Sequence, residues 1–86
     1  MKLIRSQNML SVINAKYIHY INIEDQVDEN GIDTGNVDID IYFDSKEDSW
    51  MQTIATYETT DECIRNLDRL VNFLSSSTSS GLYNMP

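Results

Sequence analysis

The sequence is poor in cysteine and has no long apolar run. Cys63 is the only cysteine among its 86 residues, so the disulfide frameworks of small secreted domains are excluded. No segment approaches the roughly 20 consecutive apolar residues needed to cross a bilayer. Residues 1–6 also lack the apolar stretch of a secretory signal. We therefore expect a single domain that works in a reducing, cytoplasmic setting.

Positive charge is also scarce. The chain has 6 Lys and Arg residues against 14 Asp and Glu residues, which gives a formal net charge of −8. Proteins that bind nucleic acid or anionic membranes directly need clustered cations, so neither kind of partner is expected. We predict instead a protein partner with a basic surface patch, because opposite charges speed encounter. The alternative is that the charge only keeps a small domain soluble.

Residues that carry catalysis or bind metals are few. The sequence has one His and one Cys, no glycine-rich phosphate loop and no Cys/His metal spacing. Cys63 falls on an apolar stripe beside two carboxylates, which is typical of a buried structural thiol, and His19 is expected to be a half-buried strand residue. An EF-hand alignment from Asp28 fails, because Ile32 occupies a ligand position and Asp33 replaces the required glycine. We predict a protein without enzymatic activity, cofactor or metal.

Alternating and helical patterns are present and predict the fold. Residues 37–43 alternate strictly between apolar and polar, which indicates a strand with one buried face. Strands are predicted over 2–6, 9–13, 17–23, 37–43 and 50–57, with a polar loop over 24–36 that is expected to be a long hairpin connection and a turn over 44–49. The predicted class is α+β, an antiparallel sheet of about five strands with one C-terminal amphipathic helix packed on one face.

The helix prediction covers residues 59–74. Thr59 and Glu62 have capping-box spacing, and apolar residues then recur every three or four positions up to Leu74. We therefore place a single domain over 1–74, followed by a flexible serine-rich tether and short apolar tail over 75–86. Two outcomes stay open for the tail: it adds a strand to its own or a neighbour's sheet edge, or it is disordered.

Two groups of residues are candidates for binding. Successive outward residues of a strand lie about 6.6 Å apart, a spacing comparable to that of backbone phosphates, so a ladder of carboxylates could act as a nucleic-acid decoy. The acidic face comprises Glu24, Asp25, Asp28, Glu29, Asp38, Asp40 and Asp44. Apolar residues on both sheet faces indicate a second layer or self-association. These are Tyr17, Tyr20, Tyr42, Trp50 and Met51.

Short motifs along the chain resemble a family of small proteins. They are Ile-Arg-Ser-Gln at 4–7, Val-Ile-Asn at 12–14, Ile-Ala-Thr-Tyr at 54–57 before the helix, and Tyr-Asn-Met-Pro at 83–86. In these motifs the chain is similar to short proteins encoded by prophages and mobile elements of Gram-positive bacteria, although Ala55 stands where the family often has glycine. The resemblance implies a phage-borne accessory protein of the bacterial cytoplasm and no catalytic residues.

Two functions are consistent with these features. The first is a non-enzymatic, prophage-encoded binding protein that inhibits a host defence nuclease, such as a CRISPR effector, by nucleic-acid mimicry. The second is a homo-oligomer with a role in assembly or in sequestering a small ligand. Charge reversal of Asp38 and Asp40 should weaken capture of the target under the first function, and a strict monomer at micromolar concentration by light scattering would exclude the second.

Overall fold

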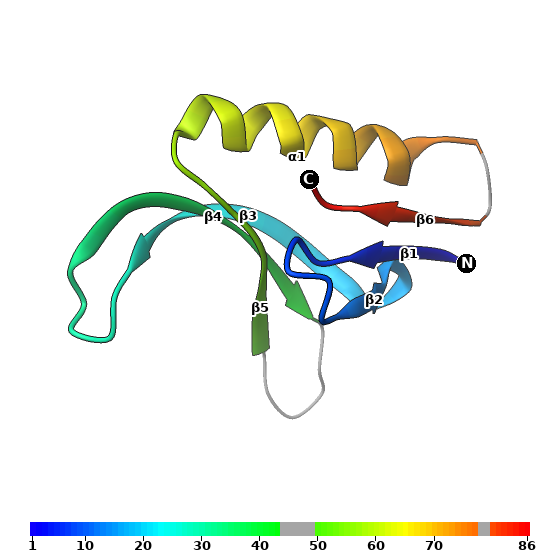
Figure 1. Cartoon of the computed structure of the whole chain (residues 1–86). Helices are drawn as coiled ribbons and strands as arrows, with labels where there is room; N and C mark the ends of the chain where they lie inside the picture. Colours follow the sequence, from blue (N-terminus) through cyan, green and yellow to red (C-terminus); the bar gives the residue numbers. More distant parts are fainter. Residues whose placement is uncertain (44–49, 78–79) are drawn as a thin grey trace.

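The computed structural model describes residues 1–43, 50–77 and 80–86. Its elements are β1 (Lys2–Arg5), β2 (Val12–Asn14), the 3-10 helix η1 (Ala15–Tyr17), β3 (Ile18–Val27), β4 (Asp33–Phe43), β5 (Trp50–Tyr57), α1 (Thr60–Ser75) and β6 (Gly81–Asn84). The described strands form two three-stranded sheets, β2-β1-β6 and β3-β4-β5, and α1 lies along them (Figure 1). The α+β class with a C-terminal helix is confirmed. The single sheet of about five strands is corrected to two sheets.

The division into two sheets follows from the partners of β1. This strand pairs antiparallel with β2 on one side and parallel with β6 on the other, so both of its edges are occupied within the first sheet. Gln7, just after β1, connects the sheets: its N–H donates to the Ile54 carbonyl at 2.7 Å, and its side-chain oxygen accepts from the Thr56 N–H at 2.8 Å. Local patterns predict that a segment is a strand but do not specify its partner, and this is why the sheet count was missed.

The segment predicted as a loop over 24–36 is mostly strand. β3 runs on to Val27 and β4 begins at Asp33, so the two form a long hairpin. Its turn is held by the Asp28 carboxylate, which accepts from the N–H groups of Asn30 and Ile32 at 2.8 and 3.0 Å. The polar composition that indicated a loop instead reflects strand ends that are exposed to solvent.

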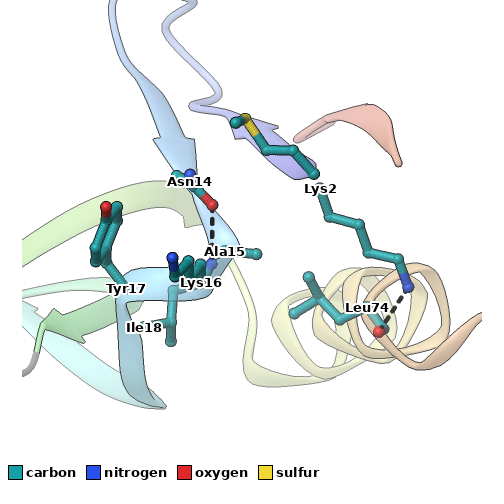
Figure 2. Close-up of a pocket in the computed structure, with 8 residues that line it drawn as sticks. Lys2, Asn14, Ala15, Lys16, Tyr17, Ile18 and Leu74 are labelled. Atoms are coloured by element: carbon teal, nitrogen blue, oxygen red, sulfur yellow. Dashed lines mark hydrogen bonds between the residues drawn. The ribbon is translucent and has the colours of Figure 1, made fainter. Parts of the chain in front are cut away.

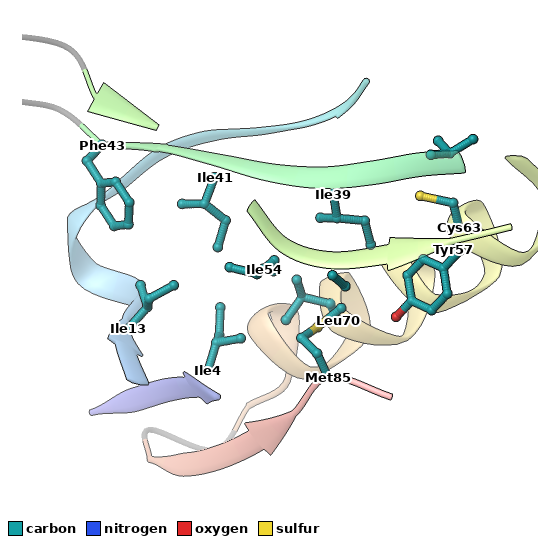
Figure 3. Packing of buried hydrophobic residues seen from close by; sticks show 12 residues of the cluster. Ile4, Ile13, Ile39, Ile41, Phe43, Ile54, Tyr57, Cys63, Leu70 and Met85 are labelled. Atoms are coloured by element: carbon teal, nitrogen blue, oxygen red, sulfur yellow. The ribbon is translucent and has the colours of Figure 1, made fainter. Parts of the chain in front are cut away.

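The apolar core lies between the two sheets and α1 (Figure 3). β4 shows the predicted alternation, with Val37, Ile39, Ile41 and Phe43 buried. β1 and β2 contribute Ile4 and Ile13, β5 contributes Ile54, and α1 contributes Cys63 and Leu70. Burying a side chain of this kind stabilises the fold by about 1.5–3 kcal/mol.

Residues 81–85 belong to the fold and not to a tail outside the domain. Ser75 ends α1, and β6 pairs in parallel with β1 from Lys2–Gly81 to Arg5–Asn84. Met85 is only 5% exposed and packs in the core. Of the two outcomes left open for the tail, the structure has the added strand, and it lies on the chain's own sheet.

The α1 boundaries agree closely with the prediction. Thr59 is the N-cap, and its hydroxyl oxygen accepts from the Glu62 N–H at 3.2 Å. At the other end, the Lys2 ammonium donates to backbone carbonyls of the last turn. These carbonyls lie at the negative end of the helix dipole, so a cation stabilises them.

Candidate functional site

Charge is segregated along the chain. Residues 1–17 contain three Lys and Arg residues and no Asp or Glu, whereas residues 18–43 contain seven Asp and Glu residues and no Lys or Arg. The second range is the β3–β4 hairpin, whose turn projects away from the β2-β1-β6 sheet (Figure 1). The molecule therefore has a cationic N-terminal sheet and an acidic hairpin, which the total charge alone does not reveal.

Glu24, Asp40 and Tyr42 form a polar cluster on the outer face of the β3-β4-β5 sheet. Asp40 is 2% exposed, and its Oδ1 accepts from the Thr53 hydroxyl at 2.6 Å. The Tyr42 hydroxyl donates to the Glu24 carboxylate. Burial, with the hydrogen bond to Glu24 as the next cause, raises the pKa of Asp40 to about 6.

The pKa of Glu24 shifts in the opposite direction. Hydrogen bonds from Asp40 and Tyr42 lower its pKa, because both donors stabilise the carboxylate form. The pair therefore shares one proton below about pH 6, with the proton on Asp40 and the charge on Glu24. The Tyr42 pKa rises to about 12, mainly because its hydroxyl is bound to Glu24.

The predicted acidic face is only partly a surface. Asp40 is buried, and half-buried Asp38 accepts from the Thr56 hydroxyl at 2.6 Å and the Gln26 amide at 3.3 Å. The structure brings Glu24, Asp38 and Asp40 together on one face, but not as an evenly exposed ladder. Asp44 lies outside the described residues. The exposed members of the set are Asp25, Asp28 and Glu29, near the hairpin turn.

The hairpin turn also exposes two apolar side chains. Val27 and Ile32 are 58% and 63% exposed and lie on either side of the turn. We call the region formed by Asp25, Val27, Asp28, Glu29, Ile32 and Asp33 the hairpin tip. Apolar groups ringed by charge are typical of a protein-binding surface. The sequence analysis missed the two apolar residues because it read the segment as a polar loop.

Aromatic residues gather at the opposite end of the same sheet. Tyr20 and Tyr42 stack with ring centroids 4.4 Å apart, and Met51 is the register partner of Tyr42. On the core side, Phe43 stacks on Trp50 at 4.3 Å. The five residues predicted for self-association therefore lie at one end of the sheet but on two faces: Tyr20, Tyr42 and Met51 are on the outer face, and Trp50 lies with Tyr17 on the other face. All but half-buried Tyr42 are exposed.

Two hollows flank η1. One, of about 600 Å³, is lined by Met1, Lys2, Asn14, Ala15, Lys16, Tyr17, Ile18 and Leu74 (Figure 2). The other, of about 400 Å³, is lined by Val12, Ile13, Asn14, Tyr17, Phe43, Trp50 and Gln52. Asn14 and Tyr17 border both hollows. No sequence pattern predicts these hollows, because they depend on how the two sheets meet.

Cys63 and His19 occupy different environments. Cys63 is fully buried, which confirms its expected structural position, and burial together with nearby Asp38 and Asp40 raises the pKa of its thiol. His19 is exposed at a bulge of β3, with its ring edge-on to Tyr20, and is not half-buried as expected. Within the described ranges, no group of three or more His, Cys, Asp or Glu residues is arranged to hold a metal ion.

No protein-family model, curated protein or solved structure matches the chain. In the part of the chain that the structure describes, no helix has the length and apolar character needed to span a membrane. The functional argument therefore rests on the surfaces themselves.

Proposed function

We propose that this chain is a non-enzymatic acidic binding protein that uses the hairpin tip to engage a protein with a basic surface patch. The observation that carries the proposal is the combination of exposed carboxylates and exposed Val27 and Ile32 in a segment without any Lys or Arg. Its negative field would accelerate encounter with a basic partner, and the two apolar side chains would supply contact area.

A narrower form of the proposal is inhibition of a host defence nuclease by a prophage-encoded protein. The negative hairpin and the resemblance to prophage proteins support it. Mimicry of nucleic acid would use Asp25, Asp28 and Glu29 at the tip, because Asp40 is buried and Asp38 is already hydrogen-bonded. Charge reversal at Asp40 would therefore test folding and not binding.

The test compares two variants that change net charge equally. Asp25→Lys/Glu29→Lys reverses two exposed charges near the tip, and Glu58→Lys/Asp68→Lys reverses two exposed charges elsewhere. Tagged proteins are used to capture partners from a Gram-positive host lysate, and each protein identified is purified for direct affinity measurement. We expect the tip variant to bind at least tenfold more weakly in 0.15 M salt, with wild-type affinity falling as salt rises.

Two results would contradict the proposal. One is equal binding by wild type and the tip variant, and the other is an equal loss in both charge-reversal variants. The proposal that the partner is a defence nuclease has one additional test. The purified partner must cleave nucleic acid, and wild-type protein must slow that cleavage more than the tip variant does.

Self-association is a second candidate function, supported by the aromatic end. Trp50 is 54% exposed, and Tyr20 and Met51 are exposed on the opposite face of the same end of the sheet. Sedimentation velocity over a micromolar concentration range tests this function. We expect an oligomer that Trp50→Ser dissociates and that Ile64→Ser, an exposed apolar position on α1, leaves intact. A monomer at all concentrations would exclude it.

A further inference from the structure

The two hollows beside η1 are neighbours on the surface, so one ligand that extends across Asn14 and Tyr17 would contact both. Asn14 and Tyr17 border the 600 Å³ hollow and the 400 Å³ hollow alike. Both volumes lie within the range of small-molecule sites. Among the described residues, no acidic side chain lines either hollow, although 14 of the 86 residues are acidic.

The first hollow offers hydrogen-bond donors that the fold does not use. Lys2 is committed, because its ammonium donates to the carbonyls of Phe73, Leu74 and Ser76 at 3.1, 2.8 and 2.9 Å. Lys16 is different. Among the described residues, its exposed ammonium contacts only the Tyr17 ring, and the Nζ atom lies 5.8 Å from the ring centroid.

Asn14 supplies a second donor in the same place. Its side-chain oxygen accepts from the Lys16 N–H at 3.0 Å, which fixes the amide at the start of η1. The amide NH2 has no partner among the described residues. A fixed amide and a nearby ammonium together suit an anionic group.

The second hollow offers aromatic surface. Phe43 and Trp50 stack at 4.3 Å on one side, and Tyr17 lies on the other. Half of the Trp50 side chain is exposed, although burying an indole is strongly favourable. A planar apolar group placed here would be in contact with aromatic side chains.

We propose that the groove over η1 binds a small organic anion with a planar aromatic body. Lys16 and Asn14 take the acidic group, and Tyr17 and Trp50 contact the ring. Residues 1–17 contain three cations and no carboxylate, so this end of the molecule repels an anion less than the acidic hairpin does. The site does not depend on partner binding by the hairpin tip.

The experiment uses a matched pair of fluorescent probes. 1-Anilinonaphthalene-8-sulfonate carries the anionic group, and N-phenyl-1-naphthylamine is nearly the same molecule without it. We expect wild-type protein to bind the sulfonate about tenfold more tightly, the effect of one charge-assisted contact. Lys16→Met should abolish this preference, and Trp50→Leu should weaken the binding of both probes several-fold.

Arg65→Met is the matched control, because it removes one exposed cation on α1, away from both hollows. It should keep the wild-type preference, and circular dichroism should show all variants folded. Equal binding of the two probes by wild type, or a preference that survives Lys16→Met, would overturn the proposal. Competition by 1-naphthoate or 1-naphthyl phosphate would show whether a carboxylate or a phosphate is preferred, and competition by neither would also overturn it.

Discussion

Replacing Asp40 with Asn should stabilise the protein at neutral pH but not at acidic pH. Asn has the shape of a protonated Asp: its oxygen can still accept from Thr53, and its NH2 can donate to Glu24 at any pH. The wild-type carboxyl must instead lose its proton in a buried position as pH rises. The substitution therefore removes the cost of ionising a buried acid.

The magnitude follows from the pKa. Asp40 shifts from an ordinary value of 3.8 to about 6 in the folded chain, and the shift corresponds to about 3 kcal/mol. Between these two pH values the folded state binds more protons than the unfolded state, so the Asp40 contribution to stability is full below pH 3.8 and is lost as pH rises through about 6. The lowered pKa of Glu24 acts in the opposite direction. We therefore expect Asp40→Asn to gain about 1–3 kcal/mol at pH 7.5 and close to nothing at pH 4.

Urea unfolding at pH 4, 5, 6 and 7.5, followed by circular dichroism, measures this difference. Asp25→Asn is the control, because it removes one exposed charge and should change stability by less than about 0.5 kcal/mol at each pH. A gain for Asp40→Asn that does not vary with pH, or a loss at pH 7.5, would refute the assignment of a shared proton to Asp40 and Glu24.

Three further predictions concern the ends of the chain and the thiol. Met85→Ala should lower the free energy of unfolding by about 2–4 kcal/mol, because the side chain is buried in the core; an unchanged urea midpoint would place the tail outside the fold. Lys2→Met should cost about 1–2 kcal/mol through the lost carbonyl contacts of α1, with Lys16→Met nearly neutral for stability. Cys63 should react with a thiol reagent only as fast as the protein opens, because it is buried and its pKa is raised. Labelling at the rate seen in urea would contradict this.

The features that the sequence predicted are those encoded locally. The capping pair Thr59 and Glu62 and the apolar stripe after it lie within one segment, so the position of α1 followed from spacing alone. The alternation in β4 identified its buried face for the same reason. Pairing of β1 with β6 joins residues almost a whole chain apart, and no local pattern specifies such a partner.

The binding candidates were harder to predict than the fold, because exposure depends on neighbours from other strands. Asp40 alternates outward in the sequence just as Asp38 does, yet it is buried beside Thr53 of β5 and Glu24 of β3. The hollows beside η1 arise from β2, β4, β5 and the end of α1. No spacing rule within one segment can anticipate surfaces that several distant segments build together.

The proton shared by Asp40 and Glu24 also affects how charge is distributed between the two proposed binding sites. At pH 5 the Asp40–Glu24 pair carries nearly one negative charge less than two ionised carboxylates would, and this reduction falls on the part of the hairpin nearer the aromatic end. The carboxylates of the hairpin tip are exposed and belong to no such pair. The negative charge of the hairpin is therefore concentrated at the tip when Asp40 is protonated. A basic protein at the tip and a small anion at the groove over η1 would be drawn to opposite ends, so occupation of one site need not oppose occupation of the other.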